Sequence, residues 1–323
     1  MQEVIFPELS EYNTVAVAVS GGADSMALVH MLNAYAQGRP KKLHIHALTV
    51  DHAMRPESGD EAAQVGRWLT KYDHVTHEVL TWHAPKPKTG KMEAARQARY
   101  ALMATYCEKH KIKMLAVGHH ADDQAETFLM RLSHGSGLDG LVGIKKVSAY
   151  DNALNLYRPL LMMQHAELIK YCKTNKIKWV EDPTNQNPAY TRTRLRDVLA
   201  QEGWDSKRLN VTLQRLERAS SALAQMSNSI SQQAQLECTE NTQTYDLKKL
   251  KHEPFEITLR IIRTALENLG TQPYGPRLEK LEEVTSTLLN SPRKTKATLG
   301  GCVLEVAPRA NYLKITRELV FKS

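Results

Sequence analysis

The residue types most able to do chemistry gather in two short stretches. The first runs Ser20, Gly21, Gly22, Ala23, Asp24 and Ser25, and it combines two hydroxyls, a carboxylate and two adjacent glycines. The second is His119-His-Ala-Asp-Asp-Gln-Ala-Glu126, with two imidazoles and three carboxylates. Hydroxyls and backbone N–H groups bind phosphate, whereas carboxylates bind magnesium or an ammonium group. The two stretches together predict a site for a phosphorylated ligand and a cation.

The elements around the first stretch would position it as a phosphate seat. Val15-Ala-Val-Ala-Val19 reads as a short buried strand, and an apolar helix begins near Asp24. The two glycines carry no Cβ atom that would hold a ligand away, and the N–H groups of the helix N-terminus point at an arriving anion. Asp24 is then a carboxylate where a phosphate-bound magnesium ion could sit. The alternative is a purely structural turn between a strand and a helix.

The second stretch places its acids on one face of a helix start. Asp122 and Glu126 are four residues apart and Asp123 and Glu126 three apart, so their side chains stack. Facing the phosphates, they would bind magnesium or hold an ammonium group. The alternative is an acidic, solvated first turn. Zinc is not expected, because no cysteine or third histidine stands at ligand spacing.

The order of elements predicts an α/β fold. Strands expected at 15–19, 43–50, 74–82 and 113–118 alternate with helices, which is typical of a parallel sheet with helices on both faces. Ligands bind at the carboxyl ends of such strands, so we expect the loops at Ser20, Asp51 and His119 to converge. Residues 1–203 would form this domain, which holds the predicted phosphate site. Residues 204–323 would hold a long connecting helix over 207–236 and a smaller, mainly helical domain, with helices at 257–269 and 277–289 and two strands within 298–318.

Composition narrows the class of protein. The 323 residues carry a net charge of +8, which fits a polyanionic partner, although many basic enzymes bind no nucleic acid. The four cysteines form no C-x-x-C pair, which speaks against an iron–sulfur or zinc-ribbon site and fits a reducing compartment. With no leader-like N-terminus and no long apolar window, we expect a soluble cytoplasmic protein without a membrane partner.

Several motifs in order resemble one enzyme family. The stretch S-G-G-A-D-S after a strand is similar to the PP-loop ATP pyrophosphatases. Further motifs narrow the resemblance to the tRNA(Ile)-lysidine synthetases; they are Asp51-His-Ala-Met-Arg-Pro, Glu93-Ala-Ala-Arg-Gln-Ala-Arg-Tyr100, Gly118-His-His-Ala-Asp-Asp-Gln-Ala-Glu-Thr127, Gly135-Ser-Gly-Leu-Asp-Gly140, Arg158-Pro-Leu160 and Tyr190-Thr-Arg-Thr-Arg-Leu-Arg196. The match covers the first 200 residues or so.

The resemblance implies a reaction in two steps. ATP adenylates the 2-oxo group of the wobble cytidine in the CAU anticodon of tRNA(Ile), and free L-lysine then displaces AMP to leave lysidine. By resemblance, Ser20 to Ser25 hold the pyrophosphate end of ATP, and Asp24 with Asp122 or Asp123 carries Mg²⁺. Glu126 and the remaining aspartate hold the lysine ammonium or accept its proton.

Two arginines complete the set that the resemblance implies. Arg99 and Arg192 would stabilise charge on the α-phosphate and on the cytidine oxygen. The alternate spacing of Arg192, Arg194 and Arg196 puts them on one face if the segment is extended and winds them round the axis if it is helical. No protein partner is implied, and a homodimer stays open. The alternatives are a tRNA thiolating enzyme on the same fold, which usually needs paired cysteines, and a non-catalytic RNA-binding relative.

Overall fold

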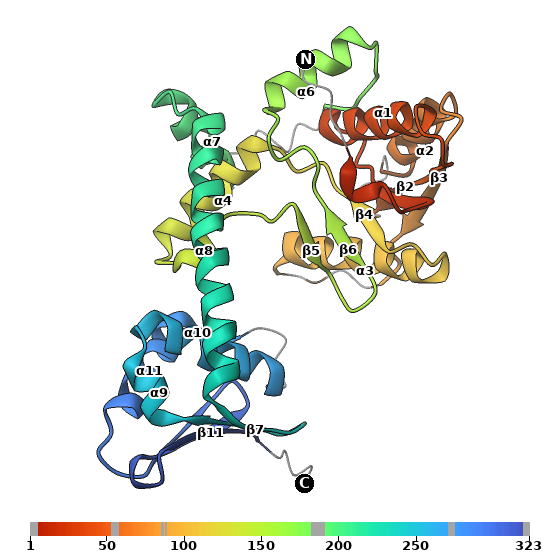
Figure 1. Cartoon of the computed structure of the whole chain (residues 1–323). Helices are drawn as coiled ribbons and strands as arrows, with labels where there is room; N and C mark the ends of the chain where they lie inside the picture. Colours follow the sequence, from red (N-terminus) through yellow and green to blue (C-terminus); the bar gives the residue numbers. More distant parts are fainter. Residues whose placement is uncertain are drawn as a thin grey trace. The chain divides into compact units, whose positions relative to one another are not determined.

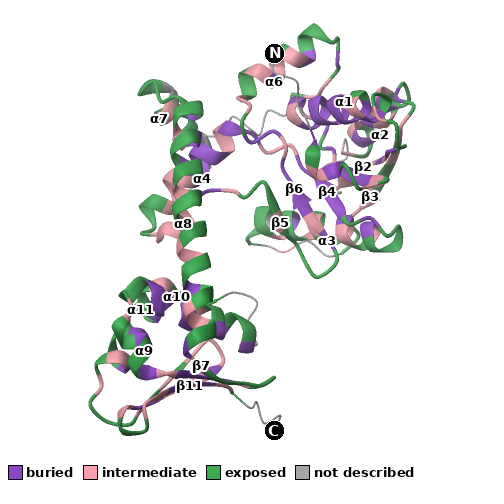
Figure 2. Ribbon diagram, viewed as in Figure 1, coloured by how far each residue is buried: buried purple, intermediate pink, exposed green. Residues whose placement is uncertain are grey.

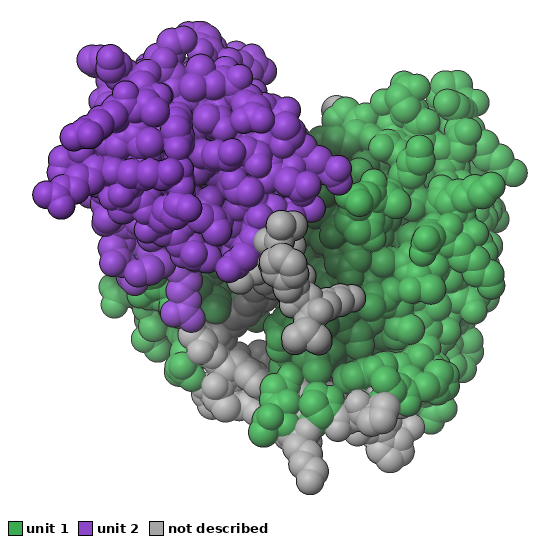
Figure 3. Space-filling view, turned by 90° about the horizontal axis from the view of Figure 1, so that it is seen from below, with its two compact units in different colours: residues 1–134, 143–213 green, residues 135–142, 214–323 purple. Residues whose placement is uncertain are grey.

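The computed structural model describes residues 6–52, 58–84, 87, 89–181, 191–270 and 275–318. Within these ranges, the side chains of five residues lie outside the description: Lys91, Thr191, Arg192, Thr193 and Ala200. The chain forms two compact units (Figure 3). Unit 1 comprises residues 1–134 and 143–213, and unit 2 comprises residues 135–142 and 214–323.

Unit 1 is built on a six-stranded sheet in the order β3-β2-β1-β4-β6-β5. Strands β1, β2, β3, β4 and β6 run parallel, and β5 is an antiparallel edge strand. The strand bounds are Thr14–Ala18 (β1), His44–Asp51 (β2), Val75–Thr81 (β3), Met114–Ala116 (β4), Val147–Ala149 (β5) and Asn155–Tyr157 (β6). The predicted parallel sheet is confirmed, while the three-residue strands β5 and β6 were not anticipated.

Helices cover both faces of this sheet (Figure 1). Val15 and Val17 of β1 face one core, which includes residues of α1, α2 and α6, while Ala16 faces a second core formed with α3. The central strands are therefore buried on both sides, as the purple colouring of Figure 2 shows. The helix bounds are Ala23–Gln37 (α1), Ser58–Leu69 (α2), Lys91–Lys109 (α3), Ala121–Ser133 (α4), His165–Thr174 (α6) and Thr191–Gln201 (α7). A 3₁₀ turn over Pro7–Leu9 precedes them.

Unit 2 packs helices against a five-stranded antiparallel sheet in the order β7-β8-β11-β10-β9. Its strands are Gln235–Cys238 (β7), Thr242–Asp246 (β8), Thr295–Leu299 (β9), Cys302–Ala307 (β10) and Tyr312–Arg317 (β11). Its helices are Leu138–Leu141 (α5), Leu247–His252 (α9), Phe255–Leu269 (α10) and Leu278–Asn290 (α11), and a 3₁₀ turn spans Pro308–Ala310. Five strands stand where the sequence predicted two, because β7, β8 and β9 are too polar to show an apolar alternation.

The long predicted helix is α8 (Ser206–Ala234), which begins in unit 1 and continues into unit 2. The division between the two compact units falls after Leu213, within this helix.

The segment 135–142 follows α4 in sequence but belongs to unit 2. Asp139 anchors it there, because its carboxylate accepts hydrogen bonds from Ser220 Oγ at 2.5 Å, Arg260 Nη2 at 2.6 Å and Arg263 Nη1 at 3.3 Å.

Candidate active site

The predicted phosphate seat has the backbone geometry that its glycines require. Gly21 adopts φ +86°, a left-handed conformation that residues with a Cβ atom rarely take, and a Cβ atom there would stand 2.9 Å from Val65 Cγ2. Gly22 precedes α1 in an extended conformation, and no side chain in the described part of the chain caps the helix. The first-turn N–H groups of α1 therefore point outward as an anion site.

Two serines flank this turn. Ser25 Oγ donates to the Gly22 carbonyl at 2.9 Å, and the oxygens of Ser20 and Ser25 lie 3.3 Å apart. Gly118 at the end of β4 brings the second motif up to the first, since a Cβ atom on Gly118 would stand 3.3 Å from the backbone of Asp24 and Ser25. A larger residue at this position would push the two motifs apart by a few tenths of an ångström, so their close approach favours glycine.

Three aspartates surround the imidazole of His120. Its Nε2 lies 3.7 Å from Asp24 Oδ2 and 3.6 Å from Asp123 Oδ2, and its Nδ1 lies 3.6 Å from Asp122 Oδ2. The Asp122 N–H donates to Nδ1 at 3.2 Å, and the Asp123 carboxylate accepts from the His120 N–H at 2.9 Å. His120 thus caps α4, and Nδ1 serves as an acceptor while Nε2 faces Asp24 and Asp123.

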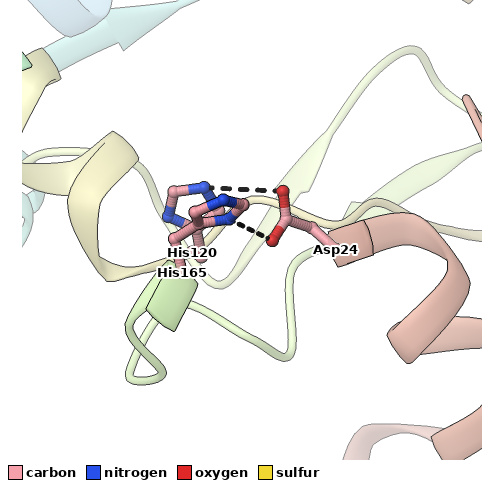
Figure 4. A group of neighbouring side chains, drawn as sticks. All are labelled: Asp24, His120 and His165. Carbon is pink, nitrogen blue, oxygen red and sulfur yellow. Dashed lines mark hydrogen bonds and ion pairs between the residues drawn. The ribbon is translucent and has the colours of Figure 1, made fainter. Parts of the chain in front are cut away.

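His165, at the start of α6, joins the same group (Figure 4). Its Nδ1 lies 2.8 Å from Asp24 Oδ1, and its backbone N–H donates to Asp122 Oδ2 at 2.8 Å. The hydrogen bond that His165 donates to the Asp24 carboxylate raises the pKa of His165 against the opposing effect of burial. The N-termini of α1, α4 and α6 therefore meet at one place, where their positive ends offset the aspartate charges.

Glu126, one turn further along α4, is buried and pairs with Arg196 of α7. Arg196 donates to Glu126 Oε1 from Nε at 2.8 Å and from Nη2 at 2.6 Å. Burial would lower the pKa of Arg196, but the charges of Glu126, Asp123 and Asp122 outweigh it and raise this pKa. The pair fixes α7 against α4.

The expected convergence of three loops can be followed at each of them. The loops at Ser20 and His119 meet, as the contacts of Asp24 with His120 demonstrate. The third loop, which follows β2, contacts the predicted residue Arg99 of α3, because Arg99 Nη2 lies 3.1 Å from His52 Nε2. Segment 191–201 is helical, so Arg192, Arg194 and Arg196 wind around its axis; the side chain of Arg192 lies outside the described part.

Sequence reasoning missed His165 and Arg196 as members of the site. Gln164 and Glu167 form a reciprocal capping box, a sequence signal that marks His165 as a first-turn residue of α6. The helix follows β6, which is parallel to β4, so its start belongs at the same edge of the sheet. Arg196 had no comparable signal, because its partner Glu126 lies 70 residues earlier.

The donor set at this edge fits magnesium. Asp24, Asp122 and Asp123 supply carboxylate oxygens beside the phosphate seat, and Mg²⁺ takes such oxygens together with substrate phosphates and water.

Comparison with known proteins identifies the family. A family model described as the PP-loop domain matches residues 1–203. A tRNA(Ile)-lysidine synthase from Bradyrhizobium sp. strain BTAi1 is 35% identical over 331 residues, covering 95% of this chain and 91% of that protein. The chain belongs to the tRNA(Ile)-lysidine synthase family. Another member, from Wolbachia pipientis wMel, is 34% identical over 311 residues, covering 93% of this chain and 70% of that protein.

The PP-loop match implies ATP as a ligand, and the family relationship implies a tRNA substrate. Among solved structures, the U34-tRNA thiolase NcsA from Methanococcus maripaludis matches with a TM-score of 0.54 and 20% identity, covering 66% of this chain and 76% of that chain. At that identity the likeness shows the fold alone. In the described part of the chain, no helix is both long and apolar enough to cross a membrane.

Proposed function

We propose that this protein uses ATP to join free L-lysine to the wobble cytidine of the CAU anticodon of tRNA(Ile). The cytidine 2-oxo group attacks the α-phosphorus of ATP and pyrophosphate leaves, which gives an adenylated cytidine. The ε-amine of lysine then attacks C2, AMP leaves, and the amine loses its proton to a carboxylate. The observation that carries the proposal is the group of aspartates beside the uncapped N-terminus of α1.

Phosphate binding is assigned to the seat formed by Ser20 to Ser25. The hydroxyl groups and first-turn N–H groups would hold the pyrophosphate end of ATP. Asp24 with Asp122 or Asp123 would hold Mg²⁺. When bound, this ion neutralises charge on the departing pyrophosphate.

The lysine ammonium is assigned to the acids of α4. Sequence reasoning gave this task to Glu126 and one aspartate. Arg196 already pairs with Glu126 through Oε1, and the Glu126 side chain is 1% exposed, so an ammonium group would have to reach a buried carboxylate that already carries an ion pair. The side chains of Asp122 and Asp123 are 30% and 14% exposed and offer the more accessible oxygens. An aspartate would then orient the amine and receive its proton, while Glu126 holds α7.

Arg99 and Arg192 are assigned to the developing charge on the α-phosphate and the cytidine oxygen. Arg99 stands beside His52 at the carboxyl end of β2, the edge at which ligands of parallel sheets bind. Arg192 lies on α7, the helix that the Arg196–Glu126 pair holds. Guanidinium groups suit this role because they donate two parallel hydrogen bonds to phosphate.

The test is lysine incorporation. The protein is incubated with ATP, magnesium, radiolabelled lysine and unmodified tRNA(Ile) bearing CAU, with elongator methionine tRNA, which shares this anticodon, as control. Label in the first tRNA and not in the second is expected. Label in neither tRNA, with ATP still bound, would refute the proposal and favour thiolation or non-catalytic RNA binding. Thiolation is disfavoured because Cys107, Cys172 and Cys302 are buried, and burial raises the pKa of each thiol.

A further inference from the structure

Asp24, His120 and His165 converge from three separate helices. One potential ligand atom from each residue lies within 4.8 Å of the other two, and the imidazole centroids are 5.3 Å apart (Figure 4). The individual separations from the Asp24 carboxylate are 2.8 Å to His165 Nδ1 and 3.7 Å to His120 Nε2. The group is more than an acidic cluster, because two of its three donors are nitrogen atoms.

The donor types select a class of ion. Two imidazole nitrogens and one carboxylate oxygen are typical ligands of zinc and its first-row neighbours, whereas magnesium prefers oxygen donors alone. Donors about 2.0–2.1 Å from a tetrahedral ion lie roughly 3.3–3.4 Å apart. His165 Nδ1 lies 2.8 Å from Asp24 Oδ1 and His120 Nε2 lies 3.7 Å from Asp24 Oδ2, so the two histidines face different oxygens of one carboxylate, and side-chain rotation is needed to bring three donors to this spacing.

The groups around the histidines support coordination. Binding of an ion at His120 Nε2 would place the imidazole proton on Nδ1, so Nδ1 would release the Asp122 N–H that it accepts in this structure and turn its proton toward Asp122 Oδ2, 3.6 Å away. That same oxygen accepts the backbone N–H of His165 at 2.8 Å. With Nδ1 protonated, the Asp122 carboxylate would contact both histidines, the ring of His120 and the backbone of His165.

We propose that Asp24, His120 and His165 bind one divalent transition metal ion of the zinc class. If Asp24 also serves the nucleotide's magnesium, as in the function proposed above, the two ions compete for it. Zinc would then inhibit adenylate formation.

Zinc binding to the full-length protein, measured by isothermal titration without ATP, tests the site. All proteins carry Cys238→Ser, because Cys238 is an exposed free thiol that could bind zinc on its own. His165→Asn and His120→Asn remove one ligand each, and asparagine retains the helix-capping ability of His120. His134→Asn is the matched control, since His134 is an exposed histidine at the other end of α4.

The Cys238→Ser parent and the His134→Asn control should bind one zinc ion per chain with equal affinity. Each ligand variant should bind at least about tenfold more weakly. Zinc should also raise the Tm of the parent and not that of His165→Asn. The absence of saturable binding near one ion per chain, or parental affinity in His165→Asn, would overturn the proposal. Lysine incorporation with magnesium and no zinc is scored separately, so the metal site and the proposed function can fail independently.

Discussion

Replacing Arg196 by methionine should destabilise unit 1 more than its exposed position suggests. The Arg196 side chain is 50% exposed, but its partner Glu126 is 1% exposed and would be left as a buried charge. Breaking a buried ion pair from one side costs about 3–5 kcal/mol. Water screens the exposed half of the guanidinium, which lowers the expected loss to about 2 kcal/mol. For a domain of this size, that loss lowers the Tm by about 4–8 °C.

Tryptophan fluorescence isolates the effect. The four tryptophans of the chain, Trp68, Trp82, Trp179 and Trp204, all lie in unit 1, so their emission during unfolding reports on that unit. Arg208→Met is the control, because its side chain is 91% exposed. If the Tm of the Arg196→Met variant equals that of the Arg208→Met control, the predicted contribution of the ion pair is refuted.

The partner substitution sharpens the test. Glu126→Gln removes the charge and leaves a carbonyl acceptor, so it should cost only about 1 kcal/mol. The free energy of unfolding should fall less in the double variant than the sum of its decreases in the two single variants. If Glu126 acts only by holding α7, both single variants should raise the KM for lysine equally. A larger rise for Glu126→Gln would instead show direct contact with the ammonium group.

Three further predictions concern other residues. Asp24→Asn should abolish ATP–pyrophosphate exchange. Its affinity for tRNA, measured by filter binding, should stay close to that of the parent because phosphate contacts dominate this affinity. Near-parental exchange would rule out the magnesium assignment. Hydrogen bonds from Tyr312 and Lys296 lower the pKa of Glu305 to about 2, so its stabilisation is present above the ordinary value of 4.5 and is lost as the pH falls toward 2. Glu305→Gln should therefore lower the free energy of unfolding by about 1 kcal/mol at pH 7 and by almost nothing at pH 2. Hydrogen exchange in β10 measures this loss, and an equal loss at both pH values would contradict the prediction. Asp139→Asn should remove the charged partner of the largely buried Arg260 and so speed amide hydrogen exchange in α10. The unfolding of unit 1, followed by tryptophan fluorescence, should stay unchanged. Unaltered hydrogen exchange would show that Asp139 anchors nothing.

What the sequence predicts well is local. The seat at Ser20 to Ser25 follows from a strand, two glycines and a helix start within a few residues, and the cap of α4 follows from its own first turn. His165 reaches Asp24 only because β6 pairs in parallel with β4, and each of these strands has three residues. The strand expected at 113–118 contains β4, but β6 is too short to show a periodicity, so the pairing that places His165 was not predicted.

The same limit explains the errors in unit 2. Thr242–Asp246 reads as a polar stretch, yet Gln243, Thr244 and Tyr245 are buried because β8 lies between β7 and β11. Burial there is decided by neighbouring strands and not by the residues' own polarity. The alternate spacing of the arginines in α7 fitted a strand as well as a helix. The segment is helical, and in this helix Arg196 pairs with Glu126.

The arrangement around His120 explains why helix starts are gathered there. Three aspartates lie within 4 Å of one imidazole, and like charges so close repel one another. The N-terminal ends of α1, α4 and α6 offset part of this repulsion, and each carboxylate oxygen that accepts a backbone N–H offsets more. The remaining negative potential favours any cation that enters, whether a metal ion or an ammonium group. Selectivity among cations must therefore come from the donor atoms that each one meets, oxygens alone or oxygen with the two imidazoles.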